Sequence, residues 1–559
     1  MVSRILKTLV SPVRGLHQAA YLLAALTLAS QVLALLRDRL FANQFGAGEI
    51  LDLYYAAFKV PDVVFALVAS LVSAYVLIPR LAKANPEEAR RLLSHTASFL
   101  VIVGGIVCAV LAVFAPAFLF QLFPTFRNSA HSAEFVLTAR LLLVQPVLLG
   151  LSGILMSVTQ INRRFVLFAL SPVLYNLGII IGTVFLYPIY GLPGIALGVL
   201  LGAVLHVAIH IPVVIHAQRM PRPTIPSPAI IWAVMKNSIP RSLALGMSSI
   251  ITLLLISLAS RTSEGGVSVY TLACNLAAVP LSLIAASYAT AAFPVMAEHF
   301  GAKRYGEFKA TLSAAARHII FWSAVITVLT IVLRAYIVRI ILGSGAFDWN
   351  DTRLTAAVLA ILVVGLMAQG IILLAARAFY AAQKSWNPLI VQLADCGISV
   401  VCAWGLVKLA VMYPVLRFFL ESLFRVGDVP GTSVLFIALG ATIGQLIMGF
   451  AALVTLRSVA PGVAGSLVRP LLEGFGAAIL GGAASYGVLT FMGALAPLTS
   501  LPTVFLEGTV AGIVGLAVAA AVLSLLENQE FRDLIDALKR ITSTRSLRPS
   551  GSADERPAA

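Results

Sequence analysis

The stretch that decides the fold is residues 31–62, QVLALLRDRLFANQFGAGEILDLYYAAFKVPD, which joins two long apolar runs through a glycine-containing turn. Charged residues close the first run and open the second, among them Arg37, Asp38, Arg39, Asp52, Lys59 and Asp62. Ionisable side chains are costly beside hydrocarbon, and they usually face a partner or a water-filled cavity. The stretch therefore indicates a polar pathway inside a membrane protein.

Composition supports a membrane protein over the whole length. The chain has 559 residues, of which 60% are hydrophobic and 11% charged. Apolar runs of about twenty residues recur from end to end, and each is long enough to cross a bilayer as a helix. The weak ten-residue alternation of a membrane β-barrel is not seen. We predict an all-α polytopic membrane protein with about fourteen transmembrane helices.

The predicted spans fall into groups. Six lie in an N-lobe, residues 16–218, six in a C-lobe, residues 219–458, and a final pair in residues 459–526. We expect residues 1–15 to be a cytoplasmic segment, and residues 527–559 to form an amphipathic helix and a disordered cytoplasmic tail. VPDVVFALVASLVSAYVLIPRLAK from Val60 resembles VPLSLIAASYATAAFPVMAE from Val279. This similarity favours two six-helix lobes in parallel repeat around a cavity, although chance likeness of apolar segments is the alternative.

Basic residues predict the orientation. The formal net charge is +16, and most Lys and Arg residues fall in loops that are cytoplasmic if both termini are cytoplasmic. The membrane accounts for this charge, and because no nucleic-acid-binding motif is present we predict no nucleic-acid partner.

Chemistry-bearing motifs are sparse. The four cysteines lie in apolar runs and are interpreted as small buried residues. His206 and His210 have the spacing of two metal ligands on one helical face, but no acidic or cysteine ligand accompanies them, so no metal is predicted. Without a nucleotide-binding loop, a nucleophile motif or a catalytic cluster, we predict no enzyme activity and no cofactor.

With these residues in view, the chain resembles the MurJ (MviN) family of lipid II flippases, as a divergent member. The resemblance rests on an Arg-Asp pair that closes the first span, a Phe-Gly-Ala-Gly turn, an Asp four residues later, and Ala-Phe-Lys-x-Pro entering the second span. It continues through INRRFVLFALSPVLYNLGIII and RAFYAAQKSWNP and covers nearly the whole chain. The family belongs to the MOP exporter superfamily.

The resemblance implies two six-helix lobes around a cationic cavity, with the last helix pair forming a lipid-facing groove. It implies an undecaprenyl-diphosphate-linked peptidoglycan precursor as substrate, and the bacterial cytoplasmic (inner) membrane as location. The implied partners are this lipid II precursor and membrane lipids, and cell-wall synthesis or division proteins are further candidates.

Several positions depart from the family's pattern. The family usually has arginine at the positions of Gln31 and Phe65, and an Asp-Arg pair with a following Glu where this chain has Cys274, Asn275 and Ala278. Each lost charge-assisted hydrogen bond is expected to weaken diphosphate binding by about 1.5–3 kcal/mol.

The candidate substrate-binding residues are Arg37, Lys59, Asp52, Gln31 and Asn275. Arg37 pairs with phosphate or anchors at the membrane interface. Asp52 is a partner or gate for Arg37 or Arg39, or a solvated loop charge. Asp395, in the middle of an apolar run, is a candidate ion or proton site.

The leading hypothesis is a lipid II flippase that works by alternating access between the inner and outer leaflets, driven by the membrane potential or a coupled ion. The alternatives are a flippase for another polyprenyl-linked glycan, a related MOP-superfamily exporter, or a transport-inactive membrane scaffold.

Overall fold

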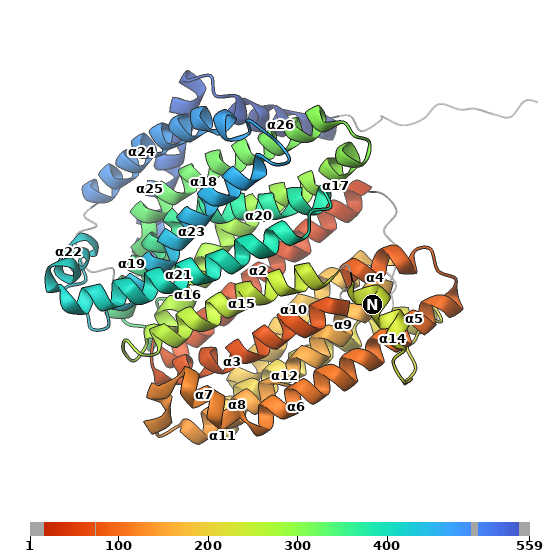
Figure 1. Ribbon diagram of the computed structural model, residues 1–559. Coiled ribbons are helices and arrows are strands. Elements are labelled where there is room, and N and C mark those ends of the chain that lie inside the picture. The colour runs from red at the N-terminus through yellow and green to blue at the C-terminus, as the bar shows by residue number, and fades with distance from the viewer. Residues whose placement is uncertain (1–15, 73, 237, 493–500, 547–559) are drawn as a thin grey trace, which may run out of the picture.

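The structure, a computed structural model, describes residues 16–72, 74–236, 238–492 and 501–546 (Figure 1). The sequence predictions for residues 1–15, for the turn at 493–500 and for the disordered tail at 547–559 lie outside these ranges.

The described residues form helices and connecting turns without strands, which confirms the all-α fold class. Among them, twelve helices are long and apolar enough to cross a membrane, or thirteen if the bent pair α19 (Trp349–Val364) and α20 (Leu366–Ala381) counts as one span. The pair meets at 46°. Thr442 and Thr327 donate hydrogen bonds to the carbonyls of Ile361 and Val363, near the end of α19. Backbone groups freed by a break at membrane depth need such partners.

The remaining helices of the first half follow in chain order: α2 (Leu16–Phe45), α3 (Glu49–Val68), α4 (Ala74–Leu81), α5 (Pro86–Phe99), α6 (Gly105–Val113), α7 (Ala115–Leu122), α8 (Ser132–Leu142), α9 (Gln145–Ile161), α10 (Phe165–Ile181), α11 (Tyr187–Tyr190), α12 (Leu192–Ala208) and α13 (Ile211–His216). The second half adds α14 (Pro228–Met235), α15 (Ile239–Ala259), α16 (Gly266–Leu281), α17 (Ser287–Gly301), α18 (Tyr305–Ile341), α21 (Trp386–Met412), α22 (Pro414–Phe424) and α23 (Val434–Leu456). In Figure 1 most red-to-yellow helices lie below the green-to-blue ones.

The repeat noticed in the sequence has a counterpart in the backbone. Pro61 lies inside α3, and a 3₁₀ turn at Ala69–Val72 follows before α4. Pro280 lies inside α16, and a π-helical turn at Ser282–Ala286 follows before α17. An internal proline removes one helical hydrogen bond, so both long spans are irregular near their middle.

The chain breaks between two helices at the start of the second half. Helix α14 ends at Met235, and a separate helix, α15, begins at Ile239. Pro240 occupies the first turn of α15. Proline has no N–H and clashes with the preceding turn, so it begins a helix far better than it continues one.

Helices α10 and α12 pack backbone to backbone. A Cβ atom built on Gly178 would lie 2.3 Å from Cα of Gly202, and one on Gly182 would lie 2.5 Å from Cα of Gly198. Small residues at such positions let membrane helices approach closely. This contact aligns the two helices that carry Asn176 and His206, both discussed below.

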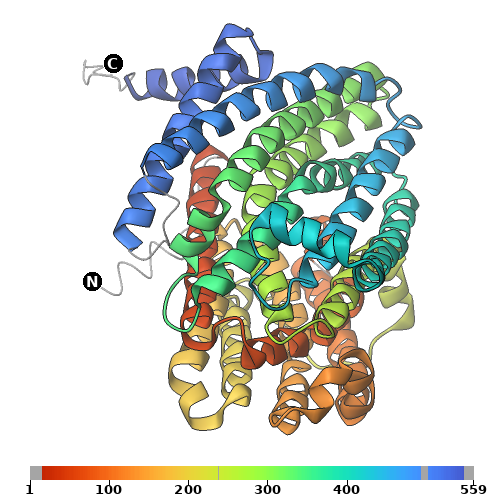
Figure 2. The same ribbon diagram turned by 90° about the vertical axis from the view of Figure 1, so that its left-hand side faces the viewer.

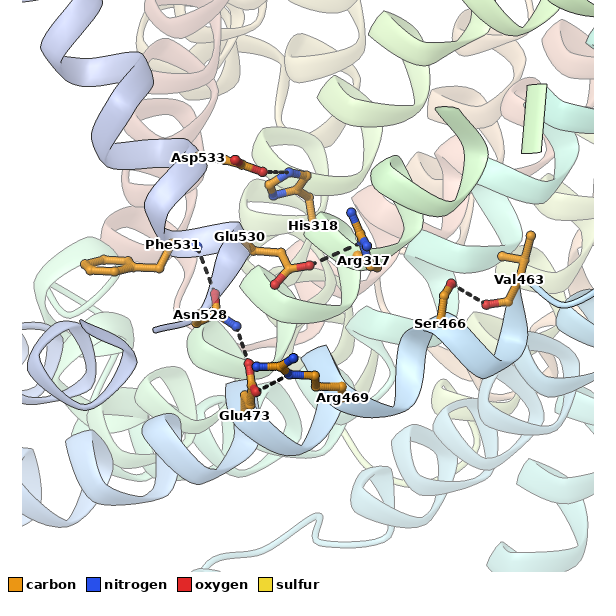
Figure 3. A network of polar contacts seen from close by, with 10 residues as sticks. All are labelled: Arg317, His318, Val463, Ser466, Arg469, Glu473, Asn528, Glu530, Phe531 and Asp533. Atoms are coloured by element: carbon orange, nitrogen blue, oxygen red, sulfur yellow. Dashed lines mark hydrogen bonds and ion pairs between the residues drawn. The ribbon is translucent and has the colours of Figure 1, made fainter. Parts of the chain in front are cut away.

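The C-terminal helices α24 (Val468–Phe491) and α25 (Leu501–Leu525) pack on each other and on α18, along the outside of the bundle (Figure 2). The last helix, α26 (Gln529–Ser546), has its first turn fixed to this group (Figure 3). Asn528, fully buried, donates to Glu473 of α24 over 2.7 Å, and Glu530 lies 3.3 Å from Arg317 of α18. The predicted amphipathic tail helix is therefore anchored by polar contacts at its start.

Candidate functional site

A polar cluster lies where α2, α10 and α16 meet. The Arg37 guanidinium donates to Asp38 Oδ1 from Nη2 over 2.7 Å and from Nε over 3.0 Å, and from Nη1 to Asn176 Oδ1 over 2.9 Å. Asn275 Nδ2, from the second half of the chain, donates to Asp38 Oδ2 over 3.0 Å. We call Arg37, Asp38, Asn176 and Asn275 the central cluster. Asp38 joins the two halves of the molecule in it.

The orientation of Asn176 follows from its own helix. Its Nδ2 donates to the Pro172 carbonyl over 3.0 Å, so its Oδ1 is the atom left to accept from Arg37. The hydrogen bond between Arg37 and Asn176 joins α2 to α10. One aromatic ring lies against the cluster: the Arg37 guanidinium carbon is 6.0 Å from the centre of the Phe41 ring.

Asp52 lies elsewhere than expected. It pairs with neither Arg37 nor Arg39 in the described contacts. Its carboxylate is 1% exposed and accepts hydrogen bonds from Gly265 N over 2.8 Å and from Ser268 N over 2.7 Å. These amides begin α16, whose N-cap residue Gly265 has no side chain. Asp52 therefore caps a helix of the opposite half, where the unpaired amides and the helix dipole favour a negative charge.

Three further contacts join the halves at the same end of the bundle. Arg39 Nη1 donates to the Ile340 carbonyl over 2.5 Å, at the C-terminus of α18. Asp351 accepts from Ala47 N over 3.2 Å, and Asn43 O accepts from Ala346 N over 2.8 Å. Together with the Asp52 cap we call these the closing contacts. They lie beside Gly46, whose φ of +60° favours glycine.

Apolar packing between the two halves also differs from one end of the bundle to the other. The largest apolar cluster draws on both halves and includes Leu53 and Val64 of α3 together with Val269 of α16. Of two smaller clusters, one lies around Leu93 of α5 and Leu155 of α9 and takes only Val234 of α14 from the second half. The other lies within the second half, around Phe308 of α18 and Phe379 of α20. The halves thus share their largest core at the end with the closing contacts, and elsewhere their cores are separate apart from Val234 of α14.

A cavity of about 400 Å³ lies within the first half. Its lining comes from α2, α3, α9, α10 and α12: Thr27, Ser30, Gln31, Phe65, Leu149, Gly153, Met156, Phe168, Ala169, Ser171, Pro172 and His206. On α2 these residues precede the central cluster, whereas the closing contacts follow it. The cavity therefore lies on the opposite side of the cluster from the closed end.

The other sequence-predicted residues have these places. Lys59 is paired with Asp62, at 3.6 Å between Nζ and Oδ2. Gln31 lines the cavity, together with Phe65. Asp395 is 7% exposed and accepts from Ser399 Oγ over 2.9 Å, one turn along α21. The described residues contain no group of three or more His, Cys, Asp or Glu side chains that could hold a metal ion.

The structure thus brings together Arg37 and Asn275, and it places Asp52, Gln31 and Asp395 at three other positions. Sequence reasoning gave no role to Asp38 as the junction or to Glu507, a buried carboxylate of α25 that accepts from Tyr336 OH over 3.1 Å. From the sequence, Asp38 was identified only as one of the charged residues. Glu507 could have been found because it is an acidic residue inside an apolar run.

Comparisons with known proteins agree on a family. The family model described as "Lipid II flippase MurJ" matches residues 41–506. A protein of Thermotoga maritima described as "Probable lipid II flippase MurJ" is 23% identical over 376 residues, which are 67% of this chain and 76% of that protein.

Solved structures share the fold. A structure of "Lipid II flippase MurJ, inward closed conformation" has a TM-score of 0.71 at 20% identity, covering 92% of this chain and all of that one. An inward-facing multidrug resistance MATE family transporter of the MOP superfamily has a TM-score of 0.63 at 16% identity, covering 79% and 98%. Because the family model spans most of the chain and the fold agrees, this protein belongs to the MurJ family of lipid II flippases.

Proposed function

We propose that this chain carries lipid II from the inner to the outer leaflet of the bacterial cytoplasmic membrane by alternating access. The observation that carries this mechanism is the asymmetry between the halves. They share their largest core and the closing contacts at one end, and at the other end their cores are separate apart from Val234 of α14. A transporter that is closed to one side and accessible from the other has this arrangement.

We further propose that both termini are cytoplasmic, which rests on the distribution of Lys and Arg. The closing contacts then lie at the outer surface, and the cavity beside Gln31 lies toward the inner leaflet. The proposed lobes are residues 16–218 and 219–458, with residues 459–526 as the peripheral pair.

Arg37 and Lys59 are the proposed cations for the diphosphate. A guanidinium fork matches phosphate oxygens in geometry and charge. Because Asp38 already occupies two of its donors, the diphosphate would take the place of this carboxylate on Arg37. Asp38 would then be free to leave Asn275, and binding would loosen the contact between the halves.

The remaining residues have proposed roles of a different kind. Gln31 and Asn275 would donate hydrogen bonds to the headgroup, and Asp52 would act as a gate, because its cap on α16 must break before the closed end can open. Asp395 is a proposed ion or proton site, since a buried carboxylate with a single serine partner has capacity for a cation. Lipid II and membrane lipids are the partners, with cell-wall synthesis or division proteins as proposed further partners.

The test is replacement of the resident flippase. A bacterium depleted of its own lipid II flippase would express this chain, and lipid II in the outer leaflet would be measured. We expect outward lipid II with the wild-type chain and its loss with Arg37→Ala, while Arg163→Ala, at a loop between α9 and α10, serves as a matched control. If the expressed wild-type chain left outer-leaflet lipid II at the depleted level, the proposal would be wrong.

A further inference from the structure

His206 lies on the wall of the cavity, with Gln31 and Phe65. It is the single ionisable residue among the residues that line the cavity. The two positions at which the family usually has arginine are thus on the same wall as a histidine, although they come from three different helices.

The hydrogen bonds of His206 define its tautomer. Ser152 Oγ donates to the His206 backbone carbonyl over 2.7 Å and lies 2.7 Å from His206 Nδ1. A serine hydroxyl has one hydrogen, so Ser152 must accept from Nδ1–H. The ring nitrogen Nε2 then keeps its lone pair, and it has no hydrogen-bond partner among the described residues. Protonation at Nε2 leaves both existing hydrogen bonds intact and creates a new donor.

The charges around the central cluster cancel in pairs. Arg37 is paired with Asp38, and Lys59 with Asp62. Arg37 and Lys59 do not line the cavity, and both already have counter-charges. A cation on the cavity wall itself would have no such competitor, and an imidazole is the side chain that gains and loses a charge near neutral pH.

The groups that face His206 carry no fixed positive charge that would disfavour protonation of its ring. On its own helix the His210 ring lies 6.0 Å away between ring centres, and on α10 the Tyr175 ring lies 6.5 Å away. Helix α9 presents Ser152 and no titratable residue. On α3 the nearest charged residue in sequence to Phe65 is Asp62, one helical turn toward the closed end.

From this geometry we infer that His206 is a substrate-binding residue that takes up a proton as the diphosphate binds. The incoming anion stabilises the imidazolium, and Nε2–H donates to a phosphate oxygen. The inference rests on the proposed function and adds a residue and a proton to it. His206 thus supplies the charge that arginines at the positions of Gln31 and Phe65 would otherwise supply.

The experiment measures affinity against pH. Full-length protein in lipid nanodiscs would be titrated with lipid II between about pH 5.5 and 8.5. We expect the affinity to fall as pH rises, by up to about tenfold per pH unit where one proton is taken up. His206→Asn should bind more weakly and lose this slope, because the Asn amide keeps a donor to Ser152 but cannot be protonated. His216→Asn, an exposed histidine at the end of α13, should behave as the wild type.

A second variant tests the inference even if His206→Asn does not fold. Gln31→Arg puts a permanent cation on the same wall, so it should raise the affinity at high pH and flatten the slope. A parallel titration with inorganic pyrophosphate tests whether the diphosphate alone produces the dependence of affinity on pH. The same slope with pyrophosphate would support the inference.

The two proposals fail in different ways. A wild-type slope that persists in His206→Asn, or the absence of a slope in a wild type that binds lipid II, overturns the role of His206 alone. No binding of lipid II at any pH overturns the proposed function as well.

Discussion

Asp52 offers the most direct test of how the two halves are held together. Its carboxylate accepts from the amides of Gly265 and Ser268 while it is itself buried. In Asp52→Ala both amides lose their partner. An unpaired buried donor costs about 1–3 kcal/mol, so the closed end loses about 2–6 kcal/mol. At 1.4 kcal/mol for each tenfold change, the ratio of closed to open molecules falls by between about thirtyfold and twenty-thousandfold.

The assay is a distance between spin labels on the two halves. In a background without the four native cysteines, labels at Asn128 and Asn350 report the closed end, because both residues are exposed and lie on opposite halves. We expect a single short distance in the parent and a longer population in Asp52→Ala.

The matched control is Asn85→Ala. Asn85 is also a helix cap, accepting from Glu88 N over 2.9 Å, but it caps α5 within one half. The control should lose stability without a change in the label distance. If Asp52→Ala kept the parent distance distribution, the cap would not hold the halves, and the reasoning would be refuted.

Three other substitutions, one of them with a control, test the central cluster, the helix packing and the anchoring of α26. Asp38→Ala leaves the Arg37 guanidinium without its carboxylate, and we expect a loss of about 3–5 kcal/mol, read as a lower unfolding temperature in detergent. Gly178→Ala should destabilise by about 1–3 kcal/mol or more, because the added Cβ meets backbone. Gly153→Ala, which meets nothing within 4 Å, should unfold like the wild type. Asn528→Ala should free the first turn of α26, read as faster limited proteolysis there; an unchanged cleavage rate would contradict the anchoring contact.

Much of the fold could be predicted because it depends on local signals. Run length locates the spans, since a helix must be long enough to cross hydrocarbon. The Val60-Pro61 and Val279-Pro280 pairs supported the repeat, and they lie in the two irregular spans, because proline changes the backbone wherever it occurs. The break before α15 also coincides with a local signal, because Lys236, Pro240 and Arg241 interrupt the apolar sequence there.

The candidate site was harder, because its contacts depend on which way each helix faces. The residue type and depth of Asp52 were visible in the sequence. Its partners are backbone amides 213 and 216 residues away, and every residue except proline has such an amide. The contact between Asp395 and Ser399 could be predicted from the sequence, since residues four apart share a helical face.

Charge was the property that single residues predicted least well. Arg37 and Lys59 indicate an electropositive pathway when they are considered one at a time, but the fold sets Asp38 and Asp62 beside them. A substrate anion then gains only the difference between its own contact with Arg37 and the contact of Asp38 that it displaces. Replacing Asp38 by Asn should therefore have two opposite effects. It weakens the hold on Arg37 in the empty protein, and it leaves the guanidinium more available to a diphosphate. We expect Asp38→Asn to bind lipid II more tightly yet transport it more slowly, because release at the outer leaflet requires the carboxylate to return. Weaker binding in a folded Asp38→Asn protein would show that Asp38 positions Arg37 and does not compete for it.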